Sequence, residues 1–165
     1  MNLKTLDVGC GNNPTGDVNV DLFLNEHTFQ CDSTSLKFID AKKIRNPVKA
    51  DAHFLPFKTN SFEEVYSSHV LEHLQSPTKA LLEMIRVSRE KVFFVVPHRF
   101  CKGHKKALRI GVHKHTFSST SVIKWLTWLK LDFSAQTTFE GILNKFLPLA
   151  YLPSEIKVEI WKATN

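Results

Sequence analysis

The sequence predicts an α/β fold built on a mostly parallel β-sheet, and three observations support this fold class. Short apolar or β-branched segments alternate with segments of helical periodicity, which is typical of βαβ units. Residues 92–96 are all apolar, the pattern of a strand buried on both faces in a parallel sheet. Near the C-terminus, strands predicted over 131–139 and 156–163 follow one another without a helix, so the sheet should end in an antiparallel pair joined by an irregular segment over 141–154.

The first two strands are separated by a segment too short for a helix. Residues 3–9 form an apolar strand that stops at the glycines of Asp7-Val-Gly-Cys-Gly11. A second strand over 18–22 carries an acid, Asp21, at its end. Because Gly9 and Asp21 are only 12 positions apart, we expect the first crossover helix to be shortened to a loop.

The middle of the chain predicts a strand, a helix and a buried strand in succession. Residues 62–67 form a strand after a polar turn. Ser76 followed by Pro77 is typical of a helix start, because serine caps the helix and proline loses no hydrogen bond at the first helical position. The apolar residues that follow lie at helical spacing and predict an amphipathic helix covering the sheet: Ala80, Leu81, Met84, Ile85 and Val87.

A second helix is predicted near residue 120. Residues 118–121 are serines and threonine, which offer several caps for a helix N-terminus. One apolar stripe follows them, formed by Val122, Ile123, Trp125, Leu126 and Leu129. This helix should therefore also pack one face against the sheet.

Length and composition limit the classes of protein that fit. The chain has 165 residues, of which 42% are hydrophobic, so a single domain spanning residues 1–165 can fold without disulfides or a structural metal. The longest apolar run near the C-terminus, 146–152, is too short for a membrane-spanning helix. The N-terminus lacks the pattern of a secretion signal, which predicts a cytoplasmic location. The three widely spaced cysteines fit free thiols in a reducing compartment: Cys10, Cys31 and Cys101.

The charge of the chain points to an anionic partner. The formal net charge is +6 and the isoelectric point is about 9.3. Residues 98–115 carry much of this excess, because they include no acid. A solvated basic loop and a patch that binds phosphate or RNA both fit this pattern.

The ends of the predicted parallel strands carry the residues with chemistry. In a parallel sheet, ligands bind at this edge, where the strand order reverses. Position 14 is Pro14 where a dinucleotide fingerprint needs its third glycine, which disfavours a nicotinamide cofactor. Asp21 could accept hydrogen bonds from both hydroxyls of a ribose or could be a turn aspartate, and Asp51 could accept one from an exocyclic amine. Two acids beside a glycine loop suggest a neutral or cationic adenosine ligand.

Four motifs together resemble one family. They are Leu6-Asp-Val-Gly-Cys-Gly-Asn12, Val18-Asn-Val-Asp21, Ala50-Asp-Ala-His-Phe-Leu-Pro-Phe57 and Ser61-Phe-Glu-Glu-Val-Tyr-Ser-Ser-His-Val-Leu-Glu-His-Leu74. In order and spacing they resemble the class I S-adenosylmethionine-dependent methyltransferases, type 11 group, which includes the ubiquinone and menaquinone biosynthesis methyltransferases. The resemblance covers roughly residues 5–98. It implies a Rossmann-like fold, S-adenosyl-L-methionine as cofactor and methyl transfer as the reaction.

The resemblance also implies roles for individual residues. It places Asp7, Gly9 and Gly11 around the methionine part of the cofactor. It places Asp21 at the ribose, and Asp51 with Ala52 at the adenine. Ser68 and His69 would line the floor of the pocket near the methionine moiety.

Methyl transfer from a sulfonium is a displacement, so the protein mainly needs to align the reactants and exclude water. No nucleophilic residue is required, and we expect no metal. If the acceptor is an alcohol, phenol or acidic carbon, a histidine is the natural general base. The first candidates are His69, His73 and His98, with His113 and His115 also available. For any one of them, a surface or hydrogen-bonded structural histidine is the more common role.

Two other function classes remain open on the sequence alone. His69-Val-Leu-Glu-His73 also matches the HxxEH motif of zinc hydrolases, in which two histidines on one helix face hold the metal. A protein of this fold could also bind the cofactor without catalysis, or serve as a subunit of a partner enzyme.

The acceptor is not identified by the sequence. The basic segment 98–115 suits an anionic small molecule or RNA, whereas the apolar segment 142–152 suits a lid over a hydrophobic acceptor or a packed connection. The resemblance does not include the N-terminal helices with which larger relatives cover the acceptor. We therefore expect a site that is open or completed by a second subunit, either another copy of the chain or a partner.

Overall fold

The structure is a computed structural model that describes residues 4–29, 36–101, 103–144 and 147–162. Cys10 and Cys101 are thiols, as predicted for both. Cys31, the third predicted thiol, lies outside the described residues. In the part of the chain that the structure covers, no helix has the length and apolar character needed to cross a bilayer.

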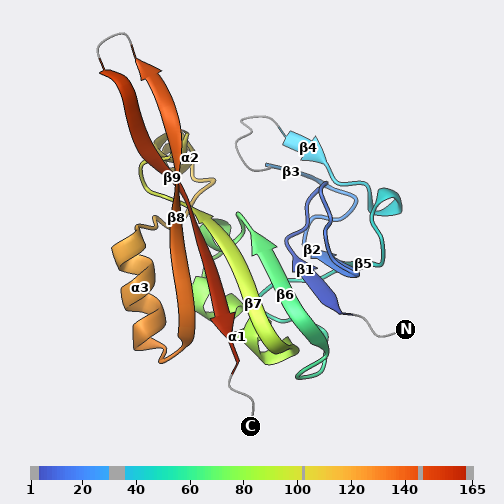
Figure 1. Cartoon of the computed structure of the whole chain (residues 1–165). Coiled ribbons are helices and arrows are strands. Elements are labelled where there is room, and N and C mark those ends of the chain that lie inside the picture. Colours follow the sequence, from blue (N-terminus) through green and yellow to red (C-terminus); the bar gives the residue numbers. More distant parts are fainter. Residues whose placement is uncertain (1–3, 30–35, 102, 145–146, 163–165) are drawn as a thin grey trace.

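One seven-stranded sheet forms the centre of the protein (Figure 1). Its strand order is β5-β2-β1-β6-β7-β9-β8. The first five of these strands run parallel, and β9 runs antiparallel to both β7 and β8. The bounds are β1 Thr5–Val8, β2 Val18–Asp21, β5 Pro47–Lys49, β6 Phe62–Ser68, β7 Ser88–Pro97, β8 Asp132–Asn144 and β9 Leu147–Trp161. The predicted α/β fold, Rossmann-like with a C-terminal antiparallel pair, is confirmed.

Between β1 and β2 the chain forms a loop and no helix, as the short spacing predicted. The helices are α1 (Pro77–Val87), α2 (His104–Arg109) and α3 (Ser119–Trp128), with 3₁₀ turns η1 (Ala41–Lys43) and η2 (Leu71–His73). A separate pair of antiparallel strands, β3 (His27–Phe29) and β4 (Leu36–Phe38), lies above the end of β1 in Figure 1. Only the two longer helices, α1 and α3, have enough turns to bury an amphipathic face.

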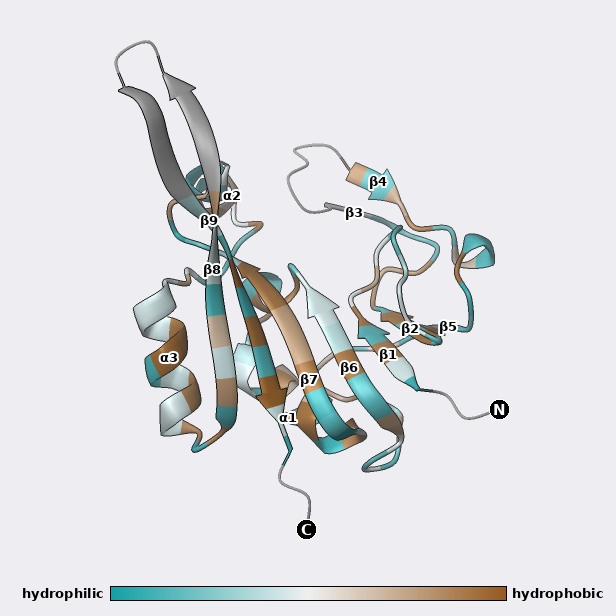
Figure 2. Ribbon diagram, in the orientation of Figure 1, coloured by the Kyte–Doolittle hydropathy of each residue, from teal (hydrophilic) through white to brown (hydrophobic). Residues whose placement is uncertain are grey.

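The core lies between the sheet and these two helices. Figure 2 shows apolar residues concentrated in β7 and on one side of α3. The two helices contact each other through the Trp125 indole N–H, which donates to the Thr78 hydroxyl at 3.0 Å. The side chains fully buried in this core come from helices and strands alike and include Leu81, Met84, Leu126, Phe94 and Ile156.

Three details differ from the sequence-based predictions. Ser76 precedes α1 as predicted, but its side chain makes no capping hydrogen bond, whereas Ser118 caps α3 through a reciprocal bond with Ser121. Ile123 is 45% exposed, because it lies beside rather than within the buried stripe of Val122 and Leu126. Part of the predicted basic loop is helical, since α2 lies within it.

The prediction of an irregular segment over 141–154 is wrong. β8 and β9 continue as a two-stranded ribbon in which Gly141 pairs with Tyr151 and Ile142 with Ala150. In Figure 1 this ribbon extends beyond the other strands of the sheet. The N–H and C=O groups of two neighbouring antiparallel strands can pair with each other without a third strand. The Gly and Pro residues of this segment therefore do not prevent the ribbon from forming. The proposed lid over 142–152 remains a prediction.

Candidate functional site

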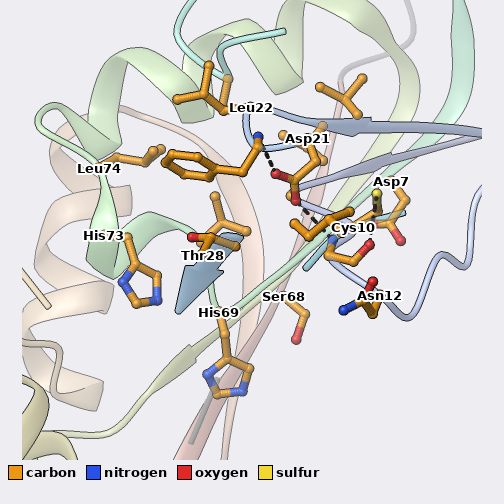
Figure 3. Close-up of a pocket in the computed structure, with 18 of the residues that line it drawn as sticks. Asp7, Cys10, Asn12, Asp21, Leu22, Thr28, Ser68, His69, His73 and Leu74 are labelled. Carbon is orange, nitrogen blue, oxygen red and sulfur yellow. Dashed lines mark hydrogen bonds between the residues drawn. The ribbon is translucent and has the colours of Figure 1, made fainter. Parts of the chain in front are cut away.

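A cavity of 690 Å³ opens at the carboxyl ends of the central parallel strands. It lies where the strand order reverses between β1 and β6, the usual place for a ligand in such sheets. The structure brings all the predicted cofactor-binding residues to this cavity: Asp7, Gly9, Gly11, Asp21, Asp51, Ala52, Ser68 and His69. Figure 3 shows several of these side chains around it.

The glycine loop depends on close backbone packing. Gly9 has φ +77° and Gly11 has φ +52°, values that L side chains rarely adopt. A Cβ on Gly9 would lie 2.1 Å from the Val70 Cγ2 atom, so no side chain fits there. The N–H groups of Gly9 and Cys10 both donate to the Val20 carbonyl, at 2.8 and 3.1 Å. The loop is thus folded onto β2 and holds its shape without a ligand.

Asp21 connects this loop to the end of β2. One carboxylate oxygen accepts from the Gly11 N–H at 2.9 Å and the other from the Phe23 N–H at 2.8 Å, drawn as dashed lines in Figure 3. A carboxylate has about four lone-pair positions, so each oxygen keeps the capacity to accept from a ligand hydroxyl. The turn role and the ribose-binding role that the sequence left open are therefore compatible.

Asp7 lies on the cavity wall, 2% exposed. Its Oδ2 atom accepts from both the N–H and the hydroxyl of Thr15, each at 2.9 Å. Burial raises the pKa of Asp7 despite these hydrogen bonds. Burial, together with the charges of Asp21 and Asp7, also raises the pKa of the Cys10 thiol to about 12. The wall is therefore acidic, which favours a ligand with a positive group and keeps Cys10 protonated.

Asp51 is hydrogen-bonded to His53, two residues further along the chain. The His53 N–H donates to the Asp51 Oδ1 at 2.8 Å, and the His53 Nδ1 atom lies 2.6 Å from the same oxygen. The Ser76 N–H donates to His53 Nε2 at 3.3 Å, which places the imidazole proton on Nδ1. Although burial opposes it, these hydrogen bonds lower the pKa of Asp51. Asp51 is thus an ionised acceptor at neutral pH.

The opposite end of the cavity is lined by histidines. His69 has φ +55° and its Nε2 atom lies 3.0 Å from the Glu155 Oε1 atom. His73 lies further along, with Nδ1 2.8 Å from the Val112 carbonyl oxygen. Because a carbonyl only accepts, His73 Nδ1 carries a proton, and in the neutral ring Nε2 carries the lone pair. His73 is therefore oriented as an acceptor or base at this end.

The helix expected for the HxxEH motif is absent. Residues 71–73 form the single 3₁₀ turn η2, and His69 precedes it in a left-handed conformation. His69 and His73 therefore do not share one face of an α-helix, which is the arrangement that the zinc hydrolase motif requires.

His98 lies apart from the cavity. It is buried, 6% exposed, and pairs as a β-bridge with Phe117. The Phe100 N–H donates to its Nδ1 atom at 3.3 Å, and burial lowers its pKa. These contacts are structural. Of the three predicted general-base candidates, the cavity is lined by His69 and His73.

The sequence reasoning missed several residues of the cavity wall. Thr28 and Lys37 come from the β3–β4 pair, and Ile110, Gly111 and Val112 come from the segment after α2. The β3–β4 strands have only three residues each, too short for a periodicity signal. The later segment was expected to be basic and to offer His113 and His115 as possible general bases, but residues 110–112 were not expected to line the cavity. Its two histidines, His113 and His115, were the signal that it returns to the site.

Comparison with known proteins matches this geometry. Residues 6–96 match the family model described as "Methyltransferase domain". One relative, the demethylmenaquinone methyltransferase of Renibacterium salmoninarum, is 33% identical over 90 residues, 52% of this chain. The chain spans only 37% of that relative's length.

Solved structures share the fold. A SAM-dependent methyltransferase from Thermotoga maritima superposes with a TM-score of 0.69 over 98% of this chain and 83% of its own, at 15% identity. The magnesium protoporphyrin IX methyltransferase of Synechocystis, solved with bound SAH, gives a TM-score of 0.58 over 98% of this chain and 74% of its own, at 13% identity. At these identities the likeness concerns the fold.

Proposed function

The chain belongs to the methyltransferase domain family, the class I S-adenosylmethionine-dependent group, and from this we propose that it transfers a methyl group from S-adenosylmethionine to an acceptor by direct displacement. The observation that carries the proposal is the cavity at the strand-order reversal, which gathers every residue that the resemblance assigns to the cofactor. No member of that set comes from outside the matched region of the family.

The residues present fit S-adenosylmethionine. The Asp21 oxygens have lone pairs left for two ribose hydroxyls after accepting from the backbone. Asp51 is an ionised acceptor for an exocyclic amine at the adenine position. The acidic wall at Asp7 suits the positive groups of the methionine part. The same acids would repel the phosphate groups of a phosphorylated nucleotide.

The protein's part in the reaction is to position the two reactants and to exclude water. When bound, the cofactor would supply a methyl group on a sulfonium, whose neutral thioether product is a good leaving group. The loop around Gly9 and Gly11 has the shape to align the methionine end of the cofactor. Such alignment of two reactants raises their effective concentration, which a displacement needs. His73 Nε2 is the favoured proton acceptor if the acceptor group is protonated, since Nδ1 is committed to Val112.

The acceptor should be anionic. Lys37 lines the cavity, and segment 98–115, which contains no acid, contributes the uncharged residues Ile110, Gly111 and Val112 to the cavity wall. This supports a phosphorylated or carboxylated small molecule, or RNA, as the methyl acceptor. A second copy of the chain or a partner subunit would complete the open side.

The first test is a calorimetric titration of the purified chain with S-adenosylmethionine and with S-adenosylhomocysteine. We expect saturable binding that Asp21→Ala weakens by about 1–3 kcal/mol, roughly 5- to 150-fold, because it removes charged acceptors. Asp132→Ala, at the far end of the sheet on β8, is the matched control and should leave the affinity unchanged.

Labelled methyl transfer to a component of a cell extract then tests catalysis. Cofactor binding without any transfer, with and without RNA and candidate partners, would favour the non-catalytic alternative. Equal affinities of Asp21→Ala and the parent chain would remove Asp21 from the site.

A further inference from the structure

We propose that Glu72, His73 and His113 form a binding site for a divalent transition metal, zinc by its ligand preference, at the acceptor end of the cavity. The sequence alone led us to expect no metal. Among the described residues, these three are brought together with one ligand atom each, all within 4.8 Å of one another. Two imidazole nitrogens and a carboxylate oxygen are a ligand set that zinc takes in proteins.

The carboxylate of Glu72 is the first observation. Glu72 is 0% exposed, and neither of its carboxylate oxygens has a hydrogen-bond partner within the described parts of the chain. Its Oε1 atom lies 3.4 Å from His69 Nδ1 and 3.8 Å from His73 Nε2, so it is directed at the histidines. A buried carboxylate without hydrogen bonds is costly, and a bound cation is one of the few groups that removes this cost.

The orientation of His73 is the second observation. Its Nδ1–H donates to the Val112 carbonyl at 2.8 Å, which leaves the Nε2 lone pair directed toward Glu72. Histidines that bind metals usually donate their other N–H to a carbonyl or carboxylate in this way, because the bond fixes the tautomer and the ring plane. His73 thus has the orientation of a ligand before any metal is present.

His113 brings a third ligand from a distant part of the sequence. Its Nδ1 atom lies 2.8 Å from His104 Nδ1, and His104 Nε2 lies 3.2 Å from the Thr116 hydroxyl. When the proton between the two rings is on His113, its Nε2 atom is free of hydrogen and can bind a metal.

The backbone holds the two ligand segments together. The N–H groups of Lys114 and His115 both donate to the Glu72 carbonyl, at 2.7 and 3.1 Å. His113 is thereby fixed beside the η2 turn despite the sequence distance. Ligand atoms around a tetrahedral zinc lie about 3.3 Å apart, so only small side-chain rotations separate the present arrangement from coordination.

The site is not that of the HxxEH hydrolases. There the two motif histidines bind and the glutamate is a base, whereas here the glutamate is itself a ligand and His113 replaces His69. Three protein ligands leave a fourth position open, and His73 also lines the cavity. A bound metal occupies the His73 Nε2 lone pair, so His73 is a proton acceptor only in the metal-free protein. That position would take an oxygen, nitrogen or sulfur atom of an anionic acceptor. This last role depends on the proposed function, but metal binding does not.

The test uses the full chain, freed of metal with a chelator and titrated with Co²⁺ and then Zn²⁺. We expect one Co²⁺ per chain with the visible absorption of a four-coordinate ion, displaced by one Zn²⁺. Glu72→Gln and His113→Gln should weaken binding at least about 100-fold. His27→Gln, which removes a histidine from the β3–β4 pair, is the matched control and should bind like the parent.

Two outcomes would overturn the proposal. One is a parent chain that shows no saturable Co²⁺ or Zn²⁺ binding, and the other is a Glu72→Gln variant that binds as tightly as the parent. Titration of the same samples with S-adenosylhomocysteine shows whether each variant is folded and tests the cofactor site separately. X-ray absorption on the zinc-loaded parent chain is independent of any variant, and a shell without two imidazoles would also contradict the assignment.

Discussion

The carboxylates at the two ends of the cavity differ in their hydrogen bonding. At the glycine loop, Asp21 has a backbone N–H on each oxygen, and Asp7 is bonded to Thr15. At the histidine end, Glu72 is more deeply buried and has no hydrogen bond on either oxygen in the described structure. The first end is complete without a ligand, whereas the second lacks a positive group. The difference indicates that the cofactor end is preorganised and that the histidine end is built around a cation.

The largest expected effect tests how rigid the glycine loop is. Gly9→Ala should destabilise the protein by about 3–5 kcal/mol, because the new Cβ meets Val70 and the positive φ is strained. Gly111→Ala, at the histidine end, has φ +75° but nothing within 4 Å of its Cβ, so only the strain of about 1 kcal/mol applies. Chemical denaturation measures both.

The double variant Gly9→Ala with Val70→Ala separates the two causes at Gly9. It should recover the part of the loss that comes from the clash, measured against Val70→Ala alone. Equal losses for Gly9→Ala and Gly111→Ala would show that the loop gives way, against a preorganised cofactor end.

The second prediction applies the same chemical change to both ends. Asp21→Asn should lower the stability of the metal-free protein by about 1–2 kcal/mol, because an amide nitrogen cannot accept from a backbone N–H. Glu72→Gln should raise it by a similar amount, because a neutral amide is cheaper to bury than an unpaired carboxylate. Thermal unfolding in the presence of chelator compares them.

Added zinc should reverse the order at the histidine end, since only the parent chain gains stability from it. A Glu72→Gln variant less stable than the parent in chelator would mean that the carboxylate is already satisfied by its histidine neighbours.

The smallest effect concerns pH at the adenine position. Hydrogen bonds from His53 lower the pKa of Asp51 in the folded state against the effect of burial. The resulting stabilisation is therefore present above the ordinary aspartate pKa and is lost as the pH falls through the lowered folded value. The free energies of unfolding of the parent and Asp51→Asn should differ most at pH 6, and the difference should shrink as the pH falls through the lowered pKa of folded Asp51. A constant difference would show that Asp51 gains nothing from ionisation.

The sequence predicted the parts of the fold that depend on local pattern. The continuous apolar run at residues 92–96 became the central strand β7, and Pro77 begins α1 as expected. The ribbon of β8 and β9 was not predicted over residues 141–154, because its pairing partner is another strand and leaves no local periodicity. The β3–β4 pair was missed for the same reason and because it is short.

The candidate cofactor site could be predicted because it lies on consecutive strand ends. A parallel sheet places the carboxyl ends of its strands at one edge, so Gly9, Asp21 and Asp51 were expected to meet there from their order alone. The histidine end could not be predicted in this way. His113 reaches Glu72 through a loop after α2, and loop paths are set by packing.

The sequence by itself thus determined the fold class, the family resemblance and the position of the acids and glycines at one edge of the sheet, since these follow from patterns over a few neighbouring residues. Only the tertiary structure decided that the Glu72 carboxylate is buried without a hydrogen-bond partner among the described residues, and that His73 and His113 lie beside it. The physical reason is that burial and side-chain contacts depend on segments about 40 residues apart, such as Val112 and His73, which no local pattern connects.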